Sequence, residues 1–281
     1  MAPIYAFIIT LREGLEAALI IGILVAYLHK IGRPDGLAPI WAGVAAALAL
    51  SVGGGLAIMG TVGELSGAAM DIFEAAAMFL AVGVLTYMVF WMGSHARHLK
   101  AQLHREVDEA LSRGSRIALG VLAFSVVVRE GLETVLFLAA GAMQAGSGVT
   151  YSGLGVLGLA VAAFLGYLLY RGSVRLDLRR FFLYTGLLLI LFAAGLLSNA
   201  FKELHEVGLV PPIIPHVWDT YDIVSDTGTV GRLLAALFGY DSSPSLVQVI
   251  AHLGYLLVAG GLYLRPARPA RPAGQTPPVR A

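Results

Sequence analysis

The string Arg-Glu-Gly-Leu-Glu occurs twice in the sequence, at residues 12–16 and at residues 129–133, each time inside an apolar stretch. Within each copy, the two glutamates are three residues apart, and the arginine stands four residues before the second glutamate. Side chains at these spacings share one face of a helix, so each copy offers two carboxylates and an arginine that can pair with the second. Carboxylate oxygens are hard donors, so the pattern indicates a site for a hard cation such as ferric iron, Mn²⁺, Mg²⁺ or Ca²⁺.

The charges of this motif are costly inside a membrane, which argues that they have a use. Each charged side chain at the centre of a membrane helix costs roughly 2.5–3.5 kcal/mol. If the two motif helices face each other, four carboxylates and two guanidinium groups converge with a formal charge of −2, which favours a multivalent cation. Arginine–glutamate pairs could instead simply hold helices together, but that role does not need two acids for each arginine. The predicted metal ligands are Glu13, Glu16, Glu130 and Glu133, supported by Arg12 and Arg129.

The composition predicts an integral membrane protein. Hydrophobic residues make up 58% of the 281 residues and charged residues only 13%, whereas soluble domains carry about 25% charged residues. The absence of cysteine excludes thiolate metal ligands and disulfides. Met88 and Met92 are four residues apart and could form a thioether site for Cu(I), although methionine is also ordinary core filler. Because the basic residues are spread over several short loops, nothing predicts binding to nucleic acid.

Apolar stretches of about 20 residues predict seven membrane-spanning helices, at residues 4–28, 38–60, 72–93, 117–144, 151–170, 181–201 and 246–264. Fifteen of the 19 Lys and Arg residues then lie on one side, in the connections 29–37, 94–116 and 171–180 and after residue 264. The positive-inside rule places that side in the cytoplasm, the N-terminus outside and the C-terminus inside. The prediction is a multi-pass protein of the plasma membrane, which in a bacterium is the inner membrane.

The two motifs lie in predicted helices of opposite direction, which indicates an inverted repeat. Residues 4–93 form the first repeat of three helices and residues 117–201 the second, and transporters of this plan hold their site at the repeat interface near the midplane. An outer loop at 202–245 leads to the seventh helix, 246–264. Residues 1–264 are thus predicted to form one transmembrane domain, and the Arg/Pro/Ala-rich tail at 265–281 is predicted to be disordered in the cytoplasm.

Further candidate ligands lie at both predicted membrane faces. Glu74 begins the third span, where it could be the first ligand of an incoming ion or simply favour the start of a helix. Glu203 and Glu206, after the sixth span, could receive metal at the outer surface or belong to a solvated helix end. The outer acids together indicate either a cation-attracting vestibule or an ordinary solvated face. Three histidines of the 94–116 connection could receive metal on exit, although a solvated basic loop is the default: His95, His98 and His104.

The doubled motif within seven predicted spans resembles the oxidase-dependent iron permease family, which includes fungal high-affinity ferric permeases and bacterial permeases of the EfeU type. The segments Asp71-Ile72-Phe73-Glu74 and Glu206-Val207-Gly208, together with Glu203, also resemble segments of that family. The resemblance implies that the substrate is Fe³⁺, that no prosthetic group is needed and that the motif glutamates are the iron ligands. It further implies a separate extracytoplasmic partner that oxidises iron or delivers it.

Two other functions stay open on the residues alone. The protein could be a permease for another cation, such as lead or manganese, because carboxylates do not by themselves choose the metal. It could also be a membrane di-iron oxidoreductase, but such sites use Glu-x-x-His pairs, whereas both motifs offer Glu-x-x-Glu. The sequence therefore favours a transporter over an enzyme, and it allows a homo-oligomer.

Overall fold

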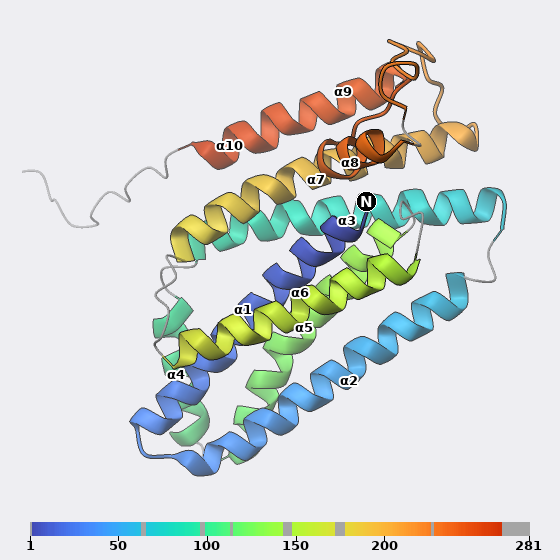
Figure 1. The fold of residues 1–281 in the computed structure, drawn as a ribbon. Helices are drawn as coiled ribbons and strands as arrows, with labels where there is room; N and C mark the ends of the chain where they lie inside the picture. The colour runs from blue at the N-terminus through green and yellow to red at the C-terminus, as the bar shows by residue number, and fades with distance from the viewer. Residues whose placement is uncertain are drawn as a thin grey trace, which may run out of the picture.

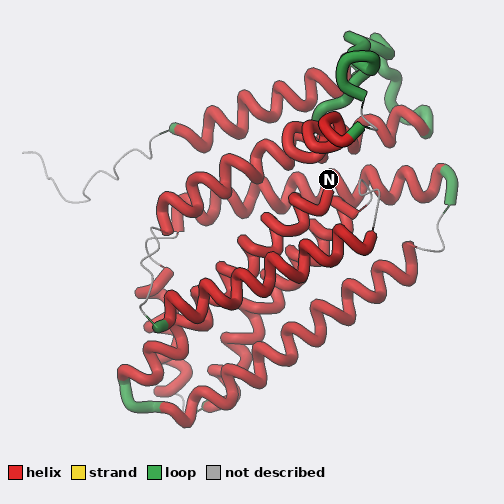
Figure 2. The backbone as a smooth tube through the Cα atoms, viewed as in Figure 1, coloured by secondary structure: helices red, strands yellow, loops and turns green. Residues whose placement is uncertain are grey.

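The computed structural model describes residues 2–62, 66–95, 99–112, 115–142, 148–171, 178–225 and 228–265, and every regular element within these ranges is helical (Figure 2). Most helices are long and are joined near their ends by short connections (Figure 1). A helix satisfies its own backbone hydrogen bonds, so long apolar stretches that enter lipid are expected to adopt this form. The predicted all-α fold class is confirmed for the described part of the chain.

The long helices correspond to the predicted spans. They are α1 (Ala2–Lys30), α2 (Leu37–Val62), α3 (Ala68–His95), α5 (Arg116–Ala142), α6 (Gly148–Tyr170) and α7 (Leu178–Glu206), with the short turn η1 (Pro34–Gly36) between α1 and α2. In the last span, α9 (Leu246–Tyr255) continues through the π-helical turn η2 (Leu256–Gly260) into α10 (Gly261–Leu264). The largest difference from prediction is at α7, which extends beyond 181–201 at both ends because helical hydrogen bonding continues where the side chains become polar.

Five helical segments are long and apolar enough to cross a membrane: Pro34–Ile58, Ala68–Met92, Val149–Tyr170, Arg180–Glu206 and Leu246–Leu264. The helices α1 and α5 have 29 and 27 residues. They fall outside this set because every 18-residue stretch of either helix contains at least three charged residues. The motif itself, rather than a generally polar sequence, therefore separates these two helices from the other five.

The packing of the helices repeats when the two halves of the chain are exchanged. α1 packs along α6, α2 packs along α5, α3 pairs with α7, and α1 also contacts α5. Exchanging α1, α2 and α3 for α5, α6 and α7 converts each of these pairs into another pair of the set or into itself. Figure 1 shows α1 and α5 running in opposite directions. This packing is what two inverted repeats related by a two-fold axis would produce, with the two motif helices in contact.

The glycine of each motif lets its helix approach a helix of the other half. A Cβ atom added at Gly14 would lie 2.7 Å from the Cβ of Ala162 in α6, and one added at Gly131 would lie 2.0 Å from Ser51 Oγ in α2. Both motif segments are α-helical throughout. The two glycines therefore serve close helix packing, as small residues commonly do between membrane helices.

Replacing Gly131 with alanine is expected to lower the stability by about 1–3 kcal/mol, the usual cost of an extra methyl group in a packed core. The thermal midpoint of unfolding in detergent measures the loss. Gly22→Ala is the matched control, because a Cβ at Gly22 would meet nothing within 4 Å. A Gly131→Ala protein as stable as the control would mean that α2 and α5 can separate without cost.

Two helices lie in segments that the sequence analysis predicts as loops. α4 (Leu99–Ser112) lies in the 94–116 connection and buries Leu103 and Val107 in a core shared with α1, α2 and α5. α8 (Thr229–Phe238) lies in the 202–245 loop and contacts α7 and α1. Both helices are too short to span a membrane, so a search for long apolar stretches does not find them. The tail beyond Arg265 lies outside the described residues.

Candidate metal centre

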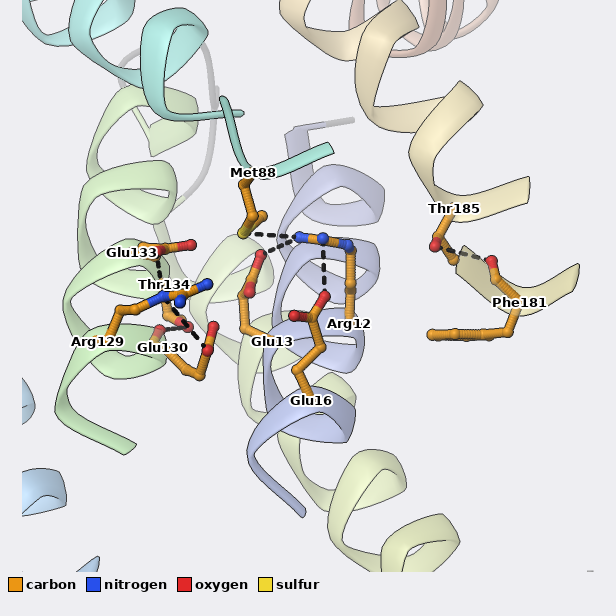
Figure 3. Close-up of polar contacts among 10 residues, drawn as sticks. All are labelled: Arg12, Glu13, Glu16, Met88, Arg129, Glu130, Glu133, Thr134, Phe181 and Thr185. Carbon is orange, nitrogen blue, oxygen red and sulfur yellow. Dashed lines mark hydrogen bonds and ion pairs between the residues drawn. The ribbon is translucent and has the colours of Figure 1, made fainter. Parts of the chain in front are cut away.

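The first motif is buried in α1 and is paired within itself (Figure 3). Arg12 Nη1 lies 2.7 Å from Glu13 Oε1, and Arg12 Nη2 lies 2.7 Å from Glu16 Oε1. All three side chains are at most 2% exposed. The predicted pairing of Arg12 with Glu16 is present, and the same guanidinium also binds Glu13. One planar fork thus holds two carboxylates in fixed positions, which a single ammonium group cannot do.

The second motif, in α5, is paired more loosely. Arg129 Nε donates to Glu133 Oε1 at 3.1 Å and lies 3.6 Å from Glu130 Oε1. The Arg129 side chain is 39% exposed, whereas that of Glu130 is 5% exposed. The two copies of one sequence motif therefore differ, because the first guanidinium is enclosed and the second is partly open.

Carboxylates of both motifs meet between α1 and α5. Glu13, Glu130 and Glu133 each contribute one oxygen to a group whose members lie within 4.8 Å of one another, and Figure 3 shows the two motifs facing each other. Among the described residues, the Oε2 atom of each of these three glutamates is buried without a hydrogen-bond partner. A buried acceptor without a donor is costly, and a bound cation would supply the missing interaction. The donor set, all carboxylate oxygen, fits a hard cation.

The fourth predicted ligand, Glu16, lies beside this group rather than in it. Glu16 is one helical turn further along α1 than Glu13, and its carboxylate is held by Arg12. The structure thus brings together three of the four predicted motif ligands and places the fourth next to them.

Helix α3 supplies contacts to both motif arginines. Arg12 Nη1 donates to Met88 Sδ at 3.2 Å, and Arg129 lies over the Trp91 ring, 4.8 Å from its centroid. The cation–π contact is worth about 0.5–2 kcal/mol. Met88 and Met92 are buried, and the Met88 sulfur faces a guanidinium. This agrees with the interpretation of Met88 as a core residue rather than as a ligand of Cu(I). Trp91 is not among the predicted site residues, and its spacing of three residues from Met88 is the one signal in the sequence that points to it.

The predicted outer acids form a separate group. Glu74 precedes Met88 by 14 residues on α3, which is about 21 Å along a helix, so Glu74 lies far from the motif carboxylates. The carboxylate of Glu203 in α7 is repelled by those of Glu206 and Glu74, and Glu74 also interacts with Asp71. Since α3 and α7 pack together, these acids gather where α3 begins and α7 ends.

Known proteins are similar to this sequence over nearly its whole length. Residues 4–265 match the Iron permease FTR1 family. The chain is 39% identical over 272 residues to the ferrous iron permease EfeU of Escherichia coli O157:H7, a match that covers 96% of this chain and 98% of that protein. It is 37% identical over 264 residues to the ferrous iron permease EfeU of Yersinia pestis, which covers 93% of each. No solved structure matches the chain.

These matches decide between the functions that the motif left open. The relatives are permeases, so the oxidoreductase interpretation is abandoned. The long apolar helices of the structure agree with a protein embedded in a membrane. With a family match that spans both copies of the buried motif, the chain belongs to the FTR1 iron permease family and is an integral membrane transporter rather than an enzyme.

Proposed function

We propose that the protein imports iron and that Glu13, Glu130 and Glu133 hold the ion midway across the membrane. The observation that carries this proposal is the convergence of three carboxylates, two buried and one partly buried, from two oppositely directed helices. Glu13 lies 11 residues from the start of α1, and Glu130 lies 12 residues from the end of α5. Both distances correspond to about 17 Å of helix, roughly half of a hydrocarbon core of about 30 Å.

The transport direction follows from a topology of seven spans, in which α1 and α5 join the five apolar helices. The connections near α4 and between α6 and α7 carry an excess of Lys and Arg. This excess supports a cytoplasmic location for the end of the molecule at which α4 lies. The N-terminus and the acids Glu74, Glu203 and Glu206 then lie outside, where they attract incoming cations. The membrane potential drives each positive charge inward by about 2.3 kcal/mol per 100 mV.

The chemistry of the ligands supports Fe³⁺ as the ion at the site. The three converging groups are all carboxylates, with no sulfur or imidazole among them, and their three charges match a trivalent ion. A separate extracytoplasmic protein would then oxidise or deliver the iron. Fe²⁺ is the second candidate, because the relatives are named ferrous iron permeases and because the two motifs together carry a formal charge of −2.

Uptake into vesicles containing the purified protein tests the proposal. Radioactive iron would be offered as ferric citrate, or as Fe²⁺ kept reduced without oxygen, with Mn²⁺ and Pb²⁺ in parallel. We expect saturable iron uptake that is faster with Fe³⁺ and little uptake of Mn²⁺ or Pb²⁺. Uptake of Fe²⁺ alone would establish the second candidate, and equal uptake of all four ions would contradict an iron site.

A further inference from the structure

A cavity of about 410 Å³ begins at Glu16, beside the metal centre, and extends toward the α4 end of the molecule. Glu16 is the motif residue that lines it, and its opposite end is lined by Tyr27, Lys30 and His104. Glu16 and Lys30 are 14 residues apart on α1, so the cavity follows that helix for about 21 Å. It is therefore long enough to connect the middle of the membrane with the face at which α4 lies.

Aromatic side chains pack on the side of the metal centre that faces away from α4. Tyr5 is buried and stacks edge-on against Phe192 with 5.2 Å between ring centroids. Phe137 and Tyr151 are buried in the same core. The cavity thus gives Glu16 access toward α4, whereas a packed aromatic core lies on the other side.

Three ligand-type side chains stand together at the far end of the cavity. The rings of Tyr27 and His104 stack with 3.9 Å between their centroids. The Tyr27 hydroxyl donates to Asp108, at 2.8 Å from Oδ1 and 3.0 Å from Oδ2. Phenol, imidazole and carboxylate are all groups that ligate iron in proteins. We call Tyr27, His104 and Asp108 the release cluster.

We propose that this cavity is the path by which iron leaves the metal centre and that the release cluster binds the ion before it enters the cytoplasm; the inference rests on the proposed function. Glu16 is the first acid on that path, one turn beyond Glu13. Lys30 also lines that end of the cavity. α4 therefore has a part in transport, since it brings two of the three ligand groups to the end of the path.

Thiol labelling tests the path, because the natural chain contains no cysteine. Gly22 lines the cavity, and Gly53 lies on the exposed face of α2; a side chain at either position would meet nothing within 4 Å. In inside-out membrane vesicles, a membrane-impermeant maleimide should label Gly22→Cys and leave Gly53→Cys unlabelled. Absence of labelling at Gly22→Cys in a folded, transport-active protein would overturn the path.

Transport kinetics test the release cluster. His104→Ala and Asp108→Asn should lower the maximal rate of iron uptake into vesicles severalfold, while equilibrium iron binding at the metal centre stays at the wild-type level. His29→Ala is the matched control, because His29 lies at the same end of α1, does not line the cavity and bonds through Nδ1 to Val25 O. His104→Phe keeps an aromatic ring against Tyr27 and removes the imidazole donor, so it should be as slow as His104→Ala.

The outcomes separate this inference from the proposed function. Wild-type rates for His104→Phe would show that His104 only packs, and would overturn the release cluster while uptake through the motif glutamates stands. Absence of iron uptake by the wild-type protein, or full uptake by Glu13→Gln, would instead overturn the proposed function itself.

Discussion

Glu130→Gln is expected to abolish iron uptake while leaving the protein as stable as the wild type or more stable. Glutamine has nearly the same shape but no charge, so the metal centre loses one of its three converging ligands. In the absence of metal, the same change removes a buried carboxylate that the other acids repel and whose Oε2 has no partner among the described residues. Binding groups commonly reduce stability in this way. Radioactive iron uptake and the thermal midpoint of unfolding, measured on the same preparation, check both expectations.

The control for this prediction is Glu109→Gln, which makes the same chemical change at an exposed position on α4. It should leave uptake and stability unchanged. Glu13→Gln and Glu133→Gln should resemble Glu130→Gln in uptake. If all three motif variants import iron at the wild-type rate, the carboxylates are structural and the metal centre is wrongly placed.

Arg12→Lys is expected to destabilise the protein and to impair uptake, although the charge is kept. The Arg12 guanidinium lies 2.7 Å from both Glu13 and Glu16 and is 2% exposed. A lysine in this place can satisfy one of these carboxylates, and the other is left buried without its partner. Breaking a buried ion pair by removing one partner costs about 3–5 kcal/mol. Because lysine keeps one of the two pairs, Arg12→Lys is expected to lower the free energy of unfolding by less than this full cost.

The matched comparison is Arg129→Lys in the second motif. The Arg129 side chain is 39% exposed, and its distances to Glu133 and Glu130, 3.1 and 3.6 Å, are longer than the 2.7 Å distances of Arg12, so less ion pairing is lost when lysine replaces it. Arg129→Lys should therefore be clearly more stable than Arg12→Lys and should retain more uptake. Equal effects of the two substitutions would mean that the burial of the first motif has no energetic consequence.

The sequence predicts the all-α fold class and the long helices of the structure well. Two charged strings inside apolar stretches are a strong signal, because few other reasons exist to place such groups in lipid. The pairing of Arg12 with Glu16 and of Arg129 with Glu133 follows from helical spacing and is present in the structure. The family predicted from these motifs is confirmed over residues 4–265.

The remainder depends on contacts between helices, which spacing along one helix does not reveal. Nothing in the identical motifs indicates that Arg12 is enclosed and Arg129 partly open, because the exposure of each arginine depends on the helices that pack against its own. Glu16 is equivalent to Glu133 in sequence, yet only Glu133 joins the converging group. The helices α4 and α8 were missed because they are short and amphipathic, so their apolar residues are too few for a membrane span.

The most direct test of the account is to locate bound iron by its anomalous X-ray scattering in crystals of the iron-loaded protein. We predict one strong peak between α1 and α5, within bonding distance of carboxylate oxygens from Glu13, Glu130 and Glu133, and its loss in Glu130→Gln. A peak confined to the acids at the ends of α3 and α7, with none between the two motifs, would contradict it.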